Sequence, residues 1–333
     1  MEEKEYNYNN GNVPVLFVKG KTLAETYHKV LLEVWEKGFD VPTSFDLPGE
    51  PKSKDATVFV EVEEPFAEPR HSKFYIGFPP SLEHYRLEVT HGVHNHWVQR
   101  YGTEWNYTYH ERLREYDNGN GEKVDQLENM VNIIANKVKE ARKKGEKPDI
   151  TNRRFQIITW IPNVDPFIID PPCLQRMHFR LAPEDKDEKS YKLNLNTDWR
   201  SRDLFKAWFM NVYAMTELQR IVAKDLSEKT GLDIKVGRYT DKSDSLHLYG
   251  KYFQDKNPTS FYTFLHRTQD LKQPLEELVY DNDFVQDMLL EGRRVLAAQL
   301  DYEKKTGNKG IIDPDLSLSE VKNSYPYPAE WDK

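Results

Sequence analysis

DLFKAWFMNVYAMTELQRIVAKDLSEK, residues 203–229, contains the longest helical pattern in the chain. Its first half has almost no wholly polar side, which is typical of a helix that is buried on most of its surface. Strand-like segments lie before it at 191–196 and after it at 233–239 and 245–249. The pattern therefore predicts a central buried helix packed against a sheet.

The rest of the chain also alternates between helical and strand-like patterns. Further helical patterns cover 22–37, 81–97, 124–143 and 283–304, and further strand-like segments cover 13–18, 57–62, 154–160 and 176–181. Thr22 and Glu25 have the spacing of a capping box, which marks the start of the first of these helices. The sequence contains no internal repeat or low-complexity linker. We therefore expect one α/β (α+β) domain over residues 1–333.

The composition limits the class of protein and its partners. The 333 residues have a formal net charge of −8, so no nucleic-acid partner is expected. A single cysteine excludes an intramolecular disulfide, which fits a reducing compartment. No apolar run reaches the roughly 20 residues of a membrane helix, and the first five residues lack the features of a signal peptide. We therefore expect a cytoplasmic protein without membrane contact, and local arginine clusters indicate a small anionic ligand.

The single cysteine, Cys173, lies in the sequence PPCLQ between two strand-like segments. A thiolate is a strong nucleophile at neutral pH, and nearby positive charge favours its formation. Arg153 and Arg154 lie upstream and Arg200 lies downstream, so cations occur on both sides of the cysteine in the sequence. A cysteine taken alone is more often a small buried apolar residue, and that alternative stays open here.

Four histidines, His84, His91, His94 and His96, are concentrated in one short segment. They could supply ligands to a metal-dependent hydrolase, but their spacing matches no common zinc motif. We therefore expect no metal, and we expect these histidines to pack or hydrogen-bond near a pocket.

The sequence has neither of the common glycine-rich phosphate loops. A phosphate would therefore have to be bound by side chains, and arginine can bind it through two parallel hydrogen bonds. The candidates are Arg153, Arg154 and Arg200. A solvated basic pair at the edge of a strand is the commoner explanation for Arg153 and Arg154.

Seven ordered blocks of the sequence resemble the thymidylate synthase family. They are Tyr107–Leu113, Val124–Leu127, Asn152–Arg154, Pro172–Cys173, Arg200–Asp203, Asn211 and Ser245–Tyr249. Their order and rough spacing match the family throughout, although each block is short. The forms Pro-Cys-Leu-Gln and Tyr-Thr-Tyr look more like those of the archaeal-type members.

The resemblance implies a reaction and the residues that carry it. Family members add a cysteine thiolate to C6 of a pyrimidine nucleotide, which makes C5 a nucleophile toward a one-carbon unit on a folate. By resemblance, Cys173 is that nucleophile, and Arg200 lowers its pKa while also contacting the phosphate. The resemblance also places Tyr109 and Asp203 among the catalytic residues, with Asp203 facing the base.

The resemblance further implies a nucleotide site shared between two subunits. Arg153 and Arg154 match the arginine pair that reaches the phosphate site of the partner subunit, so a homodimer is expected. Ser201 would donate a hydrogen bond to the phosphate. His247 and Tyr249 match the pair that holds the 3′-hydroxyl of the sugar.

Two further positions are implied for the base and for proton transfer. Asn211 matches the position that reads the base, where uracil-specific members carry Asn and cytosine-specific members carry Asp, so the expected substrate is dUMP. The catalytic glutamate should lie in the helix before the Tyr block, where Glu83 and Glu88 are both candidates. We prefer Glu88, because the pattern Tyr85-x-x-Glu88 resembles that of archaeal-type members.

The resemblance also implies an architecture and a co-substrate. It predicts a three-layer fold in which a large mixed sheet forms the dimer interface. The core would span about 75–255, with an N-terminal extension over 1–75 and a C-terminal extension over 256–333. Methylenetetrahydrofolate or a related pterin would be the co-substrate, and residues 97–105 would supply an aromatic wall beside it.

The expected reaction is the reductive methylation of dUMP to dTMP, because synthases are the commoner family members. Two departures keep other reactions open. Leu174 stands where many synthases have His, and residues 325–331 are unlike the family's C-terminal tail, which closes over the folate. The alternatives are a dUMP (or dCMP) hydroxymethylase and a catalytically silent nucleotide-binding protein. Polar residues near the presumed folate wall could deliver water for hydroxymethylation: His94, Asn95, His96 and His110.

Overall fold

The computed structural model of the protein describes residues 9–332 except 44, 45, 47, 100, 101, 103, 104 and 118–121. Its strands are β1 (Val15–Gly20), β2 (Phe39–Val41), β3 (Ser53–Val62), β4 (Tyr116–Asp117), β5 (Lys123–Val124), β6 (Gln156–Ile158), β7 (Leu174–Pro183), β8 (Ser190–Trp199), β9 (Arg202–Asp203) and β10 (Asp233–Leu248). Its α-helices are α1 (Leu23–Lys37), α2 (Phe78–His91), α3 (Tyr109–Arg114), α4 (Gln126–Lys144), α5 (Phe209–Thr230), α6 (Phe261–Leu265), α7 (Asn282–Thr306) and α8 (Leu318–Ser324).

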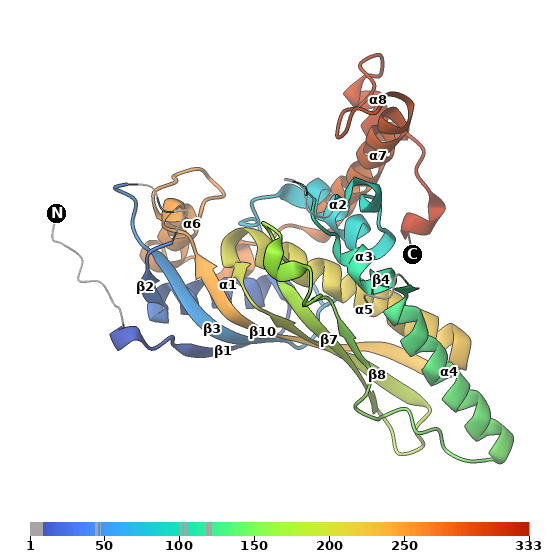
Figure 1. Ribbon diagram of the computed structural model, residues 1–333. Helices are drawn as coiled ribbons and strands as arrows, with labels where there is room; N and C mark the ends of the chain where they lie inside the picture. Colours follow the sequence, from blue (N-terminus) through green and yellow to red (C-terminus); the bar gives the residue numbers. More distant parts are fainter. Residues whose placement is uncertain are drawn as a thin grey trace.

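A large mixed sheet is the base of the fold (Figure 1). In the described part of the chain, eight strands join it in the order β1-β3-β10-β8-β7-β6, with β2 paired to β3 and β9 paired to β10. β10 runs antiparallel to β3 but parallel to β8, and β7 pairs with β8 as an antiparallel hairpin. The predicted α/β class with a large mixed sheet is confirmed.

Strand β10 differs from the prediction. The sequence predicted two strands, at 233–239 and 245–249, whereas the structure has one strand that spans both. Its pairing register shifts between Val236 and Tyr239 on the β8 side and between Ser243 and Leu246 on the β3 side. These irregularities bend a strand without ending it, which explains why the alternating pattern looks interrupted in the sequence.

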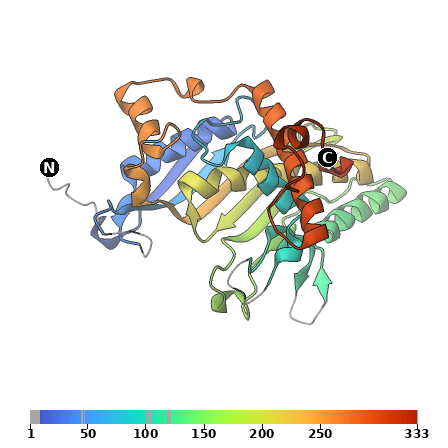
Figure 2. The same ribbon diagram turned by 90° about the horizontal axis from the view of Figure 1, so that it is seen from above.

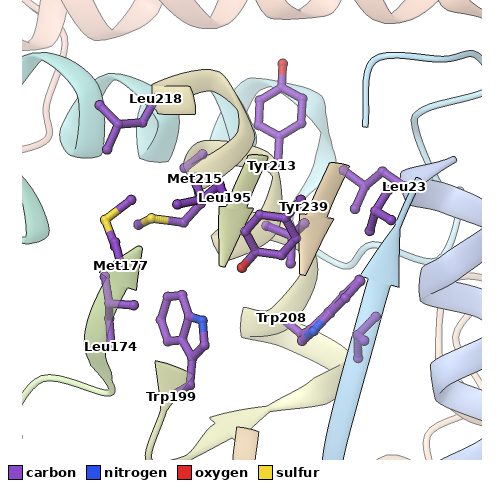
Figure 3. Packing of buried hydrophobic residues seen from close by; sticks show 14 of the residues in the cluster. Leu23, Leu174, Met177, Leu195, Trp199, Trp208, Tyr213, Met215, Leu218 and Tyr239 are labelled. Atoms are coloured by element: carbon purple, nitrogen blue, oxygen red, sulfur yellow. The ribbon is translucent and has the colours of Figure 1, made fainter. Parts of the chain in front are cut away.

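Helix α5 is the predicted central buried helix. A π-helical turn over Leu204–Trp208 precedes it, and Gly231 ends it in the left-handed conformation with φ of 65°. The helix packs on β8 and β10 and lies between α1 and α4 (Figure 2). In Figure 3 the side chains of Trp199, Trp208 and Tyr239 lie together in this core. The start of α5 is therefore held in place by a packed core of large side chains.

The two faces of the sheet are different. On β7 and β8 the residues facing α5 are buried, as alternation in a strand requires, and they include Met177, Phe179, Leu193 and Leu195. The intervening residues of these strands are polar and at least partly exposed. The helices of Figure 1 lie on the apolar face, and among the described residues no helix covers the opposite face of the sheet, which is called the open face below.

A third layer lies beyond α5. Helix α2 packs on α5, α7 packs on α2, and α8 packs on α7, so these helices are stacked away from the sheet (Figure 1). The sequence predicted one helix over 81–97. Instead, α2 ends at Gly92, which has φ of 65°, and a separate 3₁₀ turn covers Asn95–Trp97. Glycine tolerates this backbone conformation, and the break separates Glu88 from Trp97.

Local capping agrees with the sequence prediction for α1. The Thr22 hydroxyl accepts from the backbone N–H of Glu25, and the Glu25 carboxylate accepts from that of Thr22, which is the predicted capping box.

Across the described residues, no helix is both long and apolar enough to cross a membrane.

Candidate active site

A pocket of about 770 Å³ opens where α2, α3, β9, the start of α5 and the end of β10 meet. Nine of the eleven site residues predicted from the sequence border this pocket: Glu88, Tyr109, Cys173, Arg200, Ser201, Asp203, Asn211, His247 and Tyr249. They come from segments that are up to 161 positions apart in the sequence, between residues 88 and 249. The pocket also contains Asp170, which the sequence did not single out, and Arg202, which the sequence placed near the cysteine without a role at the substrate.

Cys173 lies directly before β7 and is partly buried. Its carbonyl oxygen accepts from the backbone N–H of Arg200 at 2.9 Å, and the next residue, Leu174, donates its N–H to the Tyr109 hydroxyl at 3.2 Å. Burial raises the pKa of the Cys173 thiol, Asp170 raises it further, and the Arg200 guanidinium opposes both. Arg200 thus acts in the predicted direction, but in the ligand-free protein burial is the larger influence.

The Arg200 side chain holds the loop that carries the cysteine. Its Nε donates to the carbonyl oxygen of Pro172 at 3.1 Å, and its Nη2 donates to that of Pro171 at 2.6 Å. A guanidinium has five N–H donors, so these two bonds leave three for a ligand in the pocket. Arg200 can therefore position Cys173 and bind an anion at the same time.

Arg202 is a second cation of the pocket, and it lies in the run 200–203 that the sequence indicated as a source of positive charge near the cysteine. It is 2% exposed, its Nη2 lies 2.7 Å from a carboxylate oxygen of Asp241, and it donates to the Ser243 hydroxyl. Its guanidinium also lies 4.3 Å from the ring centroid of Trp199. Arg202 lowers the pKa of Cys173 less than Arg200 does.

Asp203 borders the pocket but is also the N-cap of the π-helical turn before α5. One of its oxygens accepts from the backbone N–H groups of Phe205 and Lys206, at 3.0 and 3.1 Å. The other accepts from the Tyr252 hydroxyl at 2.5 Å. This carboxylate therefore fixes the start of the central helix against the end of the sheet.

Asn211 lies two residues into α5 and is 6% exposed. Its Nδ2 donates to the Tyr85 hydroxyl at 2.6 Å, and both residues border the pocket. This bond leaves Asn211 one N–H and its carbonyl oxygen, which are a donor and an acceptor for the edge of a base. Tyr85 lies three positions before Glu88 on α2, and this helical spacing is the signal that could have placed it in the site.

His247 and Tyr249 lie side by side at the end of β10, with ring centroids 4.6 Å apart. His247 Nδ1 lies 3.3 Å from the Ser245 hydroxyl, which donates to a carboxylate oxygen of Asp55 in β3. Burial lowers the pKa of His247, and it raises the pKa of Asp55 to about 6 against the hydrogen bond from Ser245. Among the described residues, none bonds to the buried His247 Nε2. A neutral imidazole nitrogen is thus available to a ligand hydroxyl.

The two candidate glutamates of α2 have different surroundings. Glu88 borders the pocket, and its Oε2 lies 2.9 Å from His94 Nδ1. Glu83 is fully buried between Arg86 and Arg293, with oxygen–nitrogen distances of 2.5 to 2.8 Å, and it is not among the residues that border this pocket. Position therefore favours Glu88 as the reactive carboxylate.

Arg153 and Arg154 do not border the pocket. They are exposed and lie directly before β6, at the edge of the sheet. The structure therefore places seven of the predicted nucleotide-binding and catalytic groups around Cys173 and Glu88, and leaves the arginine pair outside.

The four clustered histidines have separate partners. His84 bonds to the Gly292 carbonyl, His91 to the Glu330 carbonyl, His94 to Glu88, and His96 to Glu303. Among the described residues, no group of three histidine, cysteine or carboxylate side chains is placed to hold a metal ion.

The presumed folate wall is only partly described, because residues 100, 101, 103 and 104 lie outside the described residues. Trp105 borders the pocket, whereas none of the four polar residues near the wall does so directly: His94, Asn95, His96 and His110. His110 Nδ1 bonds to the side chain of Asn95, and burial lowers its pKa to about 4.

Comparison with known proteins agrees with the family resemblance of the sequence. The sequence model of the family described as thymidylate synthase matches residues 16–280. A protein of Methanococcoides burtonii is 25% identical over 234 residues, and one of Methanosarcina mazei is 28% identical over 232 residues. Each alignment covers 70% of this chain and 88% of the relative, and both relatives are named "Putative thymidylate synthase".

A solved structure is also similar. Thermostable thymidylate synthase A of Bacillus subtilis is 19% identical, with a TM-score of 0.47, over 70% of this chain and 81% of that one. The match to the family model covers more than half of the chain, and it extends on both sides beyond the segment 107–249 that carries the sequence resemblance. The chain belongs to the thymidylate synthase family.

Proposed function

We propose that the protein is a thymidylate synthase that converts dUMP to dTMP, with methylenetetrahydrofolate as one-carbon donor and reductant. The observation that carries this proposal is the convergence of Cys173, Arg200, Asn211 and His247 on one pocket. A nucleophile, a cation, a base-reading amide and a hydroxyl-binding imidazole are the groups that this reaction requires of a nucleotide site.

The phosphate would bind at the end of the pocket that holds Arg200 and Ser201. Arg200 retains three N–H donors beyond its bonds to the Pro171 and Pro172 carbonyls, and a guanidinium binds phosphate through paired hydrogen bonds. The Ser201 hydroxyl adds another donor at the same edge of the pocket. The sugar would extend toward His247 and Tyr249, where the Nε2 of His247 has no protein partner.

The base would lie between Cys173 and Asn211. Uracil presents an N–H donor beside a carbonyl acceptor, and the amide of Asn211 offers the complementary pair once Tyr85 has taken one of its hydrogens. Glu88, at the same pocket, is placed to exchange protons with the base. In this proposal Asn211 selects dUMP over dCMP.

The reaction begins when the Cys173 thiolate adds to C6 of dUMP, with Arg200 and Arg202 stabilising the thiolate. C5 then attacks the methylene carbon of the folate. Loss of the C5 proton and release of the folate nitrogen give an exocyclic methylene. Hydride transfer from tetrahydrofolate makes the methyl group while the C6–S bond breaks, so the products are dTMP, dihydrofolate and free Cys173.

A homodimer through the open face of the sheet belongs to this proposal. Arg153 and Arg154 are exposed outside the pocket, where they can serve the phosphate site of a partner. Phe17 is 73% exposed on this sheet and stacks on Phe59 with ring centroids 5.2 Å apart. An exposed aromatic ring stacked on a partly buried one favours an interface. Sedimentation should give a dimer at micromolar concentration, and a strict monomer would contradict this part of the proposal.

A dUMP hydroxymethylase is the second candidate function. It would share the adduct and the exocyclic methylene, but water instead of hydride would complete the reaction. The packing of residues 325–332 favours it: Trp331 is buried against Leu87 of α2, and its carbonyl oxygen accepts from Arg86, so this segment lies against α2 and α7. A pocket that is not closed over the folate admits water more easily.

Release of tritium from C5 of labelled dUMP tests the proposed chemistry. We expect release that depends on methylenetetrahydrofolate, and no release by Cys173→Ala. If the protein binds dUMP but releases no tritium, it is a silent nucleotide-binding protein. Release by Cys173→Ala would exclude covalent catalysis by the cysteine.

A further inference from the structure

Helices α7 and α8 lie after residue 280, where the match to the family model ends. Helix α7 nevertheless packs directly on α2, the helix that carries Glu88, and α8 packs on α7 (Figure 1). Three contacts join α2 to α7. Arg293 pairs with Glu83, the Gly292 carbonyl bonds to His84, and Leu296 and Ala297 pack with Leu87. A segment outside the family match is thus in a position to influence the proposed catalytic carboxylate.

Glu303 near the end of α7 makes the contact closest to the pocket. Its carboxylate is 10% exposed, and one oxygen accepts from Trp97 Nε1 at 2.6 Å and lies 3.1 Å from His96 Nε2. Lys309, just beyond α7, lies 5.3 Å from the Trp97 ring centroid. The position of the Trp97 ring is therefore set by α7 and the residues after it.

Trp97 in turn fixes His94. The two rings are stacked with centroids 4.1 Å apart and an angle of 17° between their planes. Trp105, which borders the pocket, packs edge-on against Trp97 at 4.8 Å. His94 is held in this stack with its Nδ1 2.9 Å from Glu88 Oε2. Because a carboxylate only accepts, the imidazole donates this hydrogen bond when Glu88 is ionised.

We propose that α7 is a positioning element of the site: Glu303 fixes Trp97, Trp97 fixes the ring plane of His94, and His94 holds the Glu88 carboxylate at the pocket. Glu303, Trp97 and His94 are positioning residues that act through Glu88. This inference rests on the role proposed above for Glu88.

Other groups near this chain of contacts do not replace it. From α2, Tyr85 faces Glu88 but is protonated, because burial, Tyr109 and Glu88 itself raise its pKa. His84 faces His94 and is neutral, because burial lowers its pKa. From α7, the Gly292 carbonyl bonds to His84, Arg293 pairs with Glu83, and Glu303 bonds to Trp97 and His96. None of these α7 groups bonds to Glu88 itself, whose described hydrogen bond comes from His94.

The test uses the full-length protein and variants at both ends of the contact chain. His94→Phe keeps a flat ring beside Trp97 but removes the donor to Glu88. Glu303→Met removes the acceptor for Trp97, whereas Glu303→Gln keeps a carbonyl oxygen there. Asp287→Met is the matched control, because Asp287 is an exposed carboxylate on the same helix.

Two measurements are needed. The first is the infrared spectrum of the Glu88 carboxylate in ligand-free protein, assigned with Glu88→Gln. We expect His94→Phe and Glu303→Met to shift its carboxylate stretching bands, because the carboxylate loses the hydrogen bond from His94. The second is turnover of dUMP, where we expect kcat to fall about tenfold in His94→Phe with KM nearly unchanged. Glu303→Gln and Asp287→Met should resemble the wild-type protein in both measurements.

The double variant decides whether the residues act in one chain. If Glu303 acts through His94, His94→Phe combined with Glu303→Met is no worse than His94→Phe alone. Additive losses, or Glu88 carboxylate bands that are the same in Glu303→Met and wild type, would overturn the inference. Trp97→Phe breaks the same bond while leaving α7 unchanged, so it gives the answer if Glu303→Met does not fold. If the wild-type protein does not turn over dUMP, the proposed function fails, but the infrared spectrum of Glu88 still decides this inference.

Discussion

The two sides of helix α2 use the same residue type in different ways. Glu83 is fully buried and is held by both nitrogens of the Arg86 fork and by Arg293. Glu88, five positions later, is 14% exposed at the pocket and has a hydrogen bond with His94. Five positions turn an α-helix by about 140° beyond a full turn, so the two carboxylates point to different neighbours.

Because of this difference, we expect Glu83 to contribute to stability and Glu88 to contribute to the reaction. A buried carboxylate between two arginines has its charge compensated, and its loss leaves the arginines unpaired. A carboxylate at a pocket with one partner keeps lone pairs for a substrate. Similar pairs occur elsewhere: Arg202 is paired with Asp241, whereas Arg200 keeps N–H donors facing the pocket. Glu83 and Arg202 thus each have a buried ionic partner, whereas Glu88 and Arg200 keep polar atoms for a ligand in the pocket.

The largest expected effect is a loss of turnover when Cys173, at the pocket, is replaced. Cys173→Ala should lower turnover of dUMP by about 10⁴-fold or more, because no other nucleophile can form the C6 adduct. Binding of dUMP should change little, because Arg200, Asn211 and His247 keep their contacts. Steady-state kinetics and equilibrium binding of dUMP measure the two effects. Full activity in the alanine variant would place the chemistry elsewhere.

The next largest effect is a loss of stability when Glu83, on the opposite side of α2, is replaced. Glu83→Gln should lower the free energy of unfolding by about 3–5 kcal/mol, because Arg86 would lose the carboxylate that compensates its buried charge and Arg293 would keep only Asp332. Urea denaturation measures this loss. Glu88→Gln makes the same chemical change on the same helix and is expected to lose turnover while its urea midpoint stays near that of the wild type. Equal loss of stability in the two variants would abolish the distinction between the two sides.

A smaller effect is expected at Asp55, beneath His247. Its folded-state pKa is about 6, above the usual value of 3.8, so the folded state binds its proton more tightly than the unfolded state. Wild-type stability should therefore fall as the pH rises from about 4 to 6. Asp55→Asn should remove this loss and be more stable than the wild type at pH 8, by up to about 3 kcal/mol, with no gain near pH 4. Urea unfolding at pH 4, 6 and 8 checks this; a gain that is independent of pH would contradict it.

The smallest effect is expected at the exposed arginine pair. Arg153→Ala should raise the KM for dUMP about tenfold, because one charged contact to the phosphate of the partner's site is lost. Its urea midpoint should not change, since the side chain is exposed. Arg142→Ala on α4 is the control for a general loss of positive charge. Similar kinetics in the two variants would argue against a shared nucleotide site.

Much of the fold could be predicted from local patterns. The capping box of Thr22, the amphipathic helix that becomes α4 and the apolar length of α5 each depend on residues close in sequence. The irregular pairing of β10 depends instead on its neighbours β3 and β8, which no local pattern reports. Whether the chain behaves as one cooperative domain stays a prediction.

The candidate site was predictable where short blocks carry the chemistry, as at Cys173 and Arg200. The pairing of Arg202 with Asp241 was not predictable, because it joins residues 39 positions apart through the sheet. Nor was the contact between His94 and Glu88, which depends on the turn at Gly92. The burial of Cys173 was not predictable either. The sequence places cations near the thiol, but it does not report the desolvation that outweighs them in setting the pKa of the thiol.

The most direct test of the proposed function is the mass of the product formed from dUMP and methylenetetrahydrofolate. A thymidylate synthase gives dTMP together with dihydrofolate, because the folate supplies both the carbon and the hydride. We predict these two products in equal amounts. Hydroxymethyl-dUMP together with tetrahydrofolate would contradict the proposal and show that water, rather than hydride, completes the reaction.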